Sequence, residues 1–169
     1  KPEAAIISEQ LEQFAEWLKM LETTSLTKSY KMVVLRVLLD EGRIFTGVDL
    51  NEFAKSCRRF LQNHEVLRQD LLGDGHAVDH FLAADPKWTK WWNKWPIGRW
   101  ADTQAGRIWF VREGDDFRFA PTCEQNLQAT FESMTAEIVD WRLAQYARKW
   151  KQSASSSDGA SFEAKVSHS

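Results

Sequence analysis

The sequence predicts a mainly α-helical domain with one β-hairpin, and three observations lead to this expectation. Apolar residues recur every three or four positions over residues 2–22, 25–42 and 122–149, which is the periodicity of a helix that buries one face. Residues 106–120 instead alternate between apolar and polar side chains in two short runs, which is typical of strands. Between these runs, a Glu-Gly-Asp-Asp sequence signals a tight turn.

The first two predicted helices differ in how much of their surface is apolar. The helix over residues 2–22 has a Glu-rich side and an apolar side formed by Ile6, Ile7, Leu11, Phe14, Ala15, Leu18 and Leu21. Trp17 lies beside this stripe, so we expect it to pack against a neighbour outside the chain. The helix over residues 25–42 is apolar on most of its circumference, so we expect it at the centre of the core, with Gly42 as its stop.

A third helix is expected from about Asp49, after a short extended piece and a turn at Gly47, and Asp49 or Asn51 is its candidate cap. The order helix, short strand, helix is how a winged helix-turn-helix begins. The hairpin at residues 106–120 then follows the helices, where a wing is expected. The predicted fold class is therefore mainly α and winged-helix-like.

Composition divides the chain into a domain over residues 1–150 and a segment over residues 151–169. That segment begins with KQSASSSDGAS, whose Ser and Gly content predicts a flexible linker. It ends with SFEAKVSHS, which begins like a strand and indicates the start of a following domain of a larger protein. No apolar run approaches the roughly 18 residues that a membrane span needs, and the two Cys have no short spacing. We expect a cytoplasmic protein without membrane contact.

The stretch from Lys87 to Trp100 contains five of the nine Trp residues of the chain and four basic residues. Two interpretations compete for it. Exposed indoles would stack on unpaired bases, whereas buried indoles would form the packed joint of a small domain. Burial of an indole contributes more free energy than stacking on one base, so we expect most of these Trp to be buried and one or two to be exposed.

Positive charge is concentrated in one part of a chain whose formal net charge is −2. Residues 86–118 carry seven Lys or Arg against four acids, which makes them the basic region of an acidic protein. Asp115 and Asp116 at the hairpin tip would repel phosphate and argue against deep insertion of the tip. The candidate nucleic-acid-binding residues are Lys55, Arg58 and Arg59 on the third helix, Lys87, Lys90, Lys94 and Arg99 in the Trp-rich stretch, and Arg112 and Arg118 in the hairpin.

Catalytic motifs are not found in the sequence. It has no Gly-rich phosphate loop, no Ser nucleophile motif and no distinctive pair of carboxylates, so we predict no catalytic residue and no cofactor. His76 and His80 are four residues apart and would share a helix face, which is a spacing used by some metal sites. The HExxH motif is absent because Ala77 occupies the Glu position, and further ligands are not evident. We predict a helix-surface pair and no metal, and the sequence leaves a metal at this pair open.

One resemblance adds context. The run LTKSYKMVVLRVLLDEG, followed by a helix like LNEFAKSCRRF, is similar to a segment of large bacterial DEAD/DEAH-type helicases, including those of restriction and phage-defence systems, downstream of their motor domains. The resemblance covers about a quarter of the chain and implies an accessory module of a multidomain ATP-dependent enzyme. The ATPase motifs themselves are absent, so it implies context and no activity. It assigns no DNA-contacting residue.

Together these features predict a non-catalytic DNA-binding accessory module of a larger bacterial helicase or restriction-type defence protein. It would contact the backbone of single- or double-stranded DNA. The alternative is a protein-protein interaction scaffold that docks the motor domain or a partner subunit through the acidic first helix, Trp17 and exposed aromatic residues. A third possibility, an enzyme, would require a concave pocket with convergent polar groups.

Overall fold

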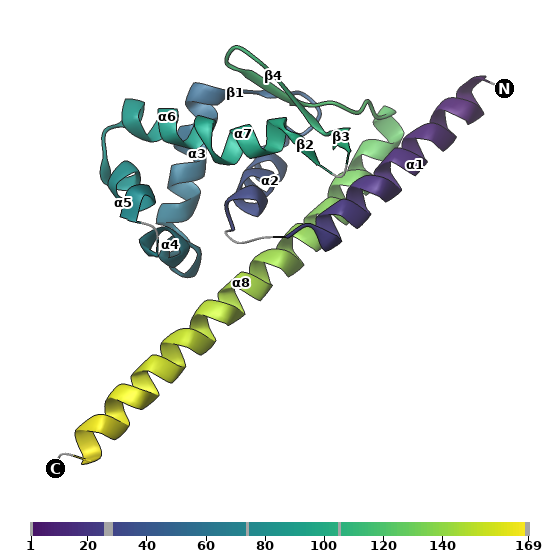
Figure 1. The fold of residues 1–169 in the computed structure, drawn as a ribbon. Coiled ribbons are helices and arrows are strands. Elements are labelled where there is room, and N and C mark those ends of the chain that lie inside the picture. The colour runs from purple at the N-terminus through teal and green to yellow at the C-terminus, as the bar shows by residue number, and fades with distance from the viewer. Residues whose placement is uncertain (1, 26–28, 74, 105, 168–169) are drawn as a thin grey trace.

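The computed structural model describes residues 2–25, 29–73, 75–104 and 106–167, and it is mostly helical with short antiparallel strands, as predicted. Helix α1 (Pro2–Thr23) lies beside the N-terminal part of the long helix α8 (Gln125–Ser167), and the remaining elements gather on one side of this pair (Figure 1). None of the helices in the described residues is long and apolar enough to cross a membrane.

Helices α1 and α8 run in the same direction, although they lie at opposite ends of the sequence. Contacts between them follow both helices in the same order: Gln10 Oε1 accepts from Glu124 N at 2.9 Å, the rings of Phe14 and Phe131 are 4.2 Å apart, Trp17 Nε1 donates to Thr135 Oγ1 at 3.2 Å, and Arg142 donates to Glu22 O at 2.6 Å. The first and last helices of the chain therefore pack side by side as a parallel pair.

The prediction that Trp17 faces a neighbour outside the chain is wrong, because its side chain is fully buried within the domain. Its ring lies 4.8 Å from that of Phe119 and 5.3 Å from that of Trp109. The buried face of α1 contains Gln10, Phe14, Trp17, Met20 and Leu21. The face of α1 that is buried against α8 therefore differs from the face that the apolar stripe predicts. Ile6 and Leu11, which belong to the predicted stripe, are exposed.

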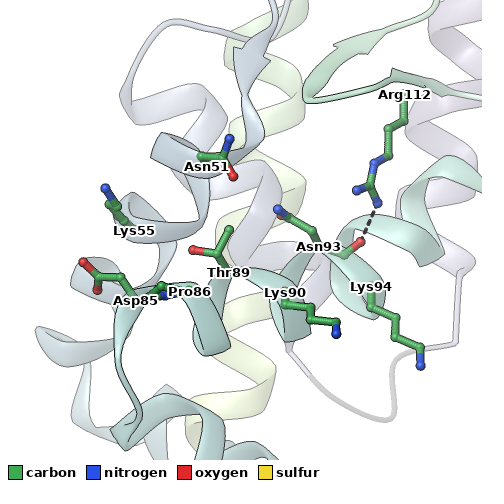
Figure 2. Close-up of a pocket in the computed structure, with 9 residues that line it drawn as sticks. All are labelled: Asn51, Lys55, Asp85, Pro86, Thr89, Lys90, Asn93, Lys94 and Arg112. Carbon is green, nitrogen blue, oxygen red and sulfur yellow. Dashed lines mark hydrogen bonds between the residues drawn. The ribbon is translucent and has the colours of Figure 1, made fainter.

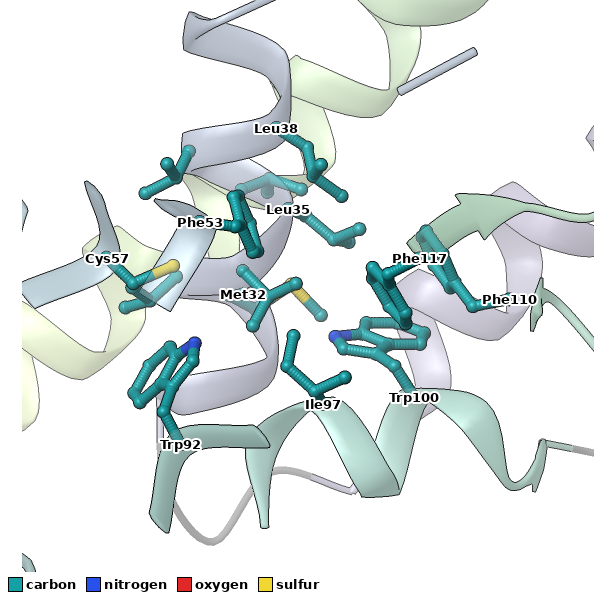
Figure 3. Packing of buried hydrophobic residues seen from close by; sticks show 14 of the residues in the cluster. Met32, Leu35, Leu38, Phe53, Cys57, Trp92, Ile97, Trp100, Phe110 and Phe117 are labelled. Atoms are coloured by element: carbon teal, nitrogen blue, oxygen red, sulfur yellow. The ribbon is translucent and has the colours of Figure 1, made fainter. Parts of the chain in front are cut away.

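Helix α2 (Tyr30–Asp40) occupies the centre of the core, as predicted. Figure 3 shows Met32 and Leu35 of this helix among aromatic side chains that include Trp92, Trp100 and Phe117. The start of α2 is held by Asp70, whose Oδ2 accepts a hydrogen bond from the backbone N of Ser29 at 2.7 Å. Gly42 follows the C-terminus with a φ of 65°, a left-handed conformation that favours glycine.

A three-stranded antiparallel sheet has the order β1 (Val48–Asp49), β5 (Asp116–Phe119), β4 (Phe110–Glu113), and a separate two-stranded sheet pairs β2 (Thr103–Gln104) with β3 (Arg107–Ile108). The predicted hairpin is thus present as β4 and β5, and its second strand pairs with the short strand that precedes α3 (Leu50–Gln62). Asp49 caps α3 by accepting from the backbone N of Asn51 at 3.0 Å. This arrangement agrees with the winged-helix-like prediction.

Four short helices connect α3 to the strands: α4 (Glu65–Leu72), α5 (Gly75–Leu82), α6 (Asp85–Lys94) and α7 (Pro96–Ala101). Pro86 lies in the first turn of α6, where proline is tolerated, and Pro96 begins α7 directly after the end of α6. The indole Nε1 of Trp88 donates to Ala54 O at 2.7 Å. This buried bond fixes α6 against α3.

Helix α8 continues to Ser167, through the segment for which the composition predicts a flexible linker. No proline follows Pro121, so every backbone N–H that the helix needs is present. The division into a domain over residues 1–150 and a segment over residues 151–169 stays a prediction.

Candidate nucleic-acid interface

A groove of about 660 Å³, lined mostly by residues with polar or charged side chains, lies between the start of α3, helix α6 and the hairpin strand β4 (Figure 2). Helix α6 forms the floor of this groove, because one side of the helix is apolar and packs into the core while the other side is polar. Trp88, Trp91 and Trp92 are buried on one side, and polar residues occupy the other. The groove is lined by Asn51, Lys55, Asp85, Pro86, Thr89, Lys90, Asn93, Lys94 and Arg112.

The groove has an excess of positive charge, with four basic side chains and one carboxylate. The carboxylate is that of Asp85, and it forms an ion pair with Arg58 at the edge of α3. Lys90 and Lys94 are exposed on α6. Lys55 Nζ lies 3.4 Å from Glu52 Oε1, in a solvent-facing ion pair that contributes little to stability. Asp85 is paired with Arg58, so the charge that the lining residues leave unpaired is mainly positive, which favours binding of anions.

Arg112 joins the hairpin to α6 at this groove. One of its terminal nitrogens donates to the backbone oxygen of Asn93 at 2.8 Å (Figure 2). Its Nε is 3.4 Å from the backbone oxygen of Gly114, a long contact. A guanidinium carries five N–H donors, so Arg112 can hold the hairpin in place and still donate to an anion in the groove.

The structure brings together four of the nine predicted binding residues, namely Lys55, Lys90, Lys94 and Arg112. The other candidates lie outside the groove. Lys87 and Arg99 are exposed on α6 and α7, and Arg59 is exposed on α3, where it donates to Ser56 Oγ at 3.1 Å. Arg118 donates to Asp116 at 3.1 Å, and this hydrogen bond raises the pKa of the guanidinium. Carboxylates of the hairpin therefore already surround Arg118.

Arg58 was predicted to contact phosphate, but its side chain is used inside the protein. It is 12% exposed, and it donates to Ala83 O at 2.9 Å while pairing with Asp85. Its guanidinium also lies 5.5 Å from the ring centroid of Trp88. These contacts fasten the connection between α5 and α6 onto α3, so we leave Arg58 out of the candidate interface.

Three neutral polar residues of the groove were not among the predicted binding residues: Asn51, Thr89 and Asn93. Their polar side chains add hydrogen-bonding groups between the cations. Asn93 is 7% exposed, and its Oδ1 has no hydrogen-bond partner within the described part of the chain. The four-residue spacing of Thr89 and Asn93 was the available signal, since residues four apart share a helix face.

The expectation that most indoles of the Lys87–Trp100 stretch are buried is confirmed. Trp88, Trp91, Trp92 and Trp100 belong to the core, whereas Trp95 is 46% exposed. The stretch is therefore first a structural joint. Trp100 lies 5.3 Å from Phe110 of β4 and donates from Nε1 to Lys31 O at 2.9 Å, so it connects the hairpin to α2.

Within the residues that the structure describes, no group of three or more His, Cys, Asp or Glu side chains is placed to hold a metal ion. The ring of His80 stacks at 5.6 Å from that of Trp91. The side chain of His76 lies outside the described residues, and so does the predicted pairing of His76 with His80.

Comparison with known proteins gives no relative: no protein-family model, no curated protein and no solved structure matches this chain. The resemblance to helicase-associated segments thus stays a prediction. The groove described above has to be interpreted from its own residues.

Proposed function

We propose that this domain binds DNA by its phosphate backbone in the groove between α3, α6 and the hairpin. The observation that carries the proposal is the convergence of Lys55, Lys90, Lys94 and Arg112 from three separate elements on one groove. Single cations on a helix surface are common, but cations brought together from distant parts of the sequence form a site that an anionic polymer can follow.

Lysine side chains are suited to contact phosphates without reading sequence, because each presents a compact charge on a flexible stem. We therefore expect low sequence specificity and an affinity that falls steeply as salt increases. Glu113, Asp115 and Asp116 surround the hairpin tip and repel phosphate there. The DNA strand is thus expected to lie along the base of the hairpin beside Arg112, and not around the hairpin tip.

The wider context of the proposal comes from the sequence. The run LTKSYKMVVLRVLLDEG supports an accessory, non-catalytic module of a larger bacterial helicase or restriction-type defence protein in the cytoplasm. In such a protein the groove would hold the DNA on which the motor acts, and the partners would be DNA and the rest of the parent polypeptide.

The experiment is a DNA-binding titration at about 50 mM salt, where phosphate contacts are strong. The 169-residue chain is titrated against labelled single-stranded and duplex DNA. The double variant Lys90→Glu, Lys94→Glu should bind roughly tenfold more weakly or worse, because it places repulsive charge in the groove. The matched control is Lys19→Glu, Lys149→Glu, whose residues are exposed on α1 and α8. Lack of binding by the unmodified chain, or equal loss in both variants, contradicts the proposal.

A second candidate function is docking of the motor domain or a partner subunit, and exposed apolar side chains on α1 and α8 favour it. Leu11 is 52% exposed, and Met134 and Trp141 are exposed on α8. Since Met134 and Trp141 are seven residues apart, they share a helix face. Helix α1 also carries exposed Glu residues, so a basic amphipathic helix is the partner whose charge would complement it.

Trp17 has no part in this surface, because it is buried. The variant Trp141→Ser separates the two functions. It should leave DNA affinity unchanged and weaken association with the motor domain, as measured by calorimetry. If the motor domain binds both forms equally, the docking function is contradicted.

A further inference from the structure

Trp95 differs from the other indoles of the Lys87–Trp100 stretch. It is 46% exposed, whereas Trp88, Trp91, Trp92 and Trp100 are all buried. From its spacing with Trp88, Trp91 and Trp92, the sequence places Trp95 on the same helix side. The structure ends α6 at Lys94 and begins α7 at Pro96, and Trp95 lies between the two helices. The break at Pro96 therefore leaves this indole partly in solvent.

Two basic side chains accompany the exposed ring. Lys94 Nζ lies 5.2 Å from the ring centroid of Trp95, and the guanidinium carbon of Arg99 lies 5.9 Å from it. Both distances are within the range in which a cation is attracted to an indole face. An aromatic face beside two exposed cations is the combination that proteins use to bind single-stranded nucleic acid.

Trp95 is also connected to the groove. Lys94 lines the groove and is adjacent to Trp95 in sequence and in space. A DNA strand whose phosphates contact Lys90 and Lys94 therefore passes next to the exposed indole. In a duplex the bases are already stacked on each other and paired, so only an unpaired base can use this face.

We propose that Trp95 stacks on an unpaired base, so that the groove prefers single-stranded DNA over duplex DNA. The inference rests on the proposed function and adds the substrate class to it. Lys94 and Arg99 contribute attraction for the phosphates on either side of the stacked base. Arg99, which lies outside the groove itself, thereby gains a role at the same site.

The test separates base contacts from phosphate contacts. The affinity of the 169-residue chain is measured for oligothymidine and for an abasic oligomer of the same length, which keeps the phosphates and lacks the bases. The unmodified chain should bind oligothymidine roughly tenfold more tightly than the abasic oligomer. Trp95→Ala should abolish this preference, and Trp95→Phe should keep most of it because a ring remains.

Trp141→Ala is the matched control, since Trp141 is 48% exposed on α8, away from the groove lining. It should keep the full preference for oligothymidine. Equal binding of the two oligomers by the unmodified chain overturns stacking and leaves backbone binding in place. A preference that survives in Trp95→Ala also overturns the role of Trp95. Failure of the unmodified chain to bind either oligomer overturns the proposed function and this inference together.

Discussion

The guanidinium of Arg112 donates a hydrogen bond to the backbone oxygen of Asn93, 2.8 Å away. Asn93 lies in the last turn of α6, where helix carbonyls have no partner within the helix. The hydrogen bond therefore gives this carbonyl a partner and holds strand β4 beside the C-terminus of α6. Because Lys90, Lys94 and Arg112 line the same groove, this contact also sets the position of the hairpin relative to the lysines.

Arg112→Ala should lower the free energy of unfolding by about 1 kcal/mol, the usual contribution of one such hydrogen bond at a partly exposed site. Urea denaturation measures this change. Arg112→Lys keeps the charge and loses the planar fork, so it should recover DNA affinity more fully than stability. Unchanged stability of the Ala variant would show that the hairpin is held by other contacts.

Arg58 and Arg59 are adjacent in sequence, but they should respond differently to substitution. Arg58→Ala removes the contacts to Ala83 O and Asp85 from a side chain that is 12% exposed, so it should destabilise the domain by about 2 kcal/mol. Arg59 is exposed, so Arg59→Ala should change stability by no more than about 0.5 kcal/mol. Urea denaturation of both variants is the measurement, and equal effects would contradict the packing role of Arg58.

Gly47 and Gly114 both have positive φ, at 81° and 59°. An Ala at either position adopts a left-handed conformation, which costs about 1 kcal/mol. At Gly47 the added Cβ would also lie 3.1 Å from Arg118 Cβ and 3.2 Å from Phe117 O, whereas nothing lies within 4 Å at Gly114. Gly47→Ala should therefore lower the thermal midpoint more than Gly114→Ala. Equal shifts would show that β5 moves away without cost.

Cys123 should alkylate slowly at neutral pH. Burial and the neighbouring carboxylates of Glu124 and Glu132 disfavour its thiolate and raise the pKa to about 11. Since the thiolate is the reactive form, the rate of reaction with iodoacetamide should rise with pH until about pH 11. The fully buried Cys57 should react only after unfolding, and Cys123→Ser isolates its contribution. Rapid labelling of Cys123 at pH 7 would contradict the raised pKa.

Much of the fold follows from local patterns in the sequence. The periodicity of residues 2–22 and 25–42 predicts α1 and α2, and the alternation around the Glu-Gly-Asp-Asp turn predicts the hairpin, because these signals depend on near neighbours. The buried face of α1 was not predictable in the same way. It is decided by α8, whose Thr135 pairs with Trp17 across 118 residues of sequence.

The candidate site is predictable in its charge and less so in its membership. The basic region of the sequence contains Lys90, Lys94 and Arg112, and the structure places them in one groove. Sequence could not separate Arg58 from Arg59, since the difference depends on where the connection after α5 docks. It also passed over Asn93, because a neutral side chain gives no charge signal.

The Ser-rich segment after residue 150 has a composition that does not decide between a helix and a linker. Ser lowers helix propensity only modestly, and Gly159 lowers it by about 1 kcal/mol, so a segment with Ser, Ala, one Gly and no proline is compatible with a helix as well as with a linker. Helix α8 continues through it to Ser167. The assignment of this segment as a linker between domains stays a prediction.

The measurement that tests the account most directly is the salt dependence of binding to oligothymidine. Log affinity falls as log salt rises, and each phosphate contact makes this slope steeper by about 0.7 for single strands. The triple variant Lys55→Ala, Lys90→Ala, Lys94→Ala should therefore have a slope that is shallower by about 2. The control Lys19→Ala, Arg148→Ala, Lys149→Ala, which removes the same charge at exposed positions of α1 and α8, should keep the slope of the unmodified chain. Equal slopes for the two triple variants would contradict binding in the groove.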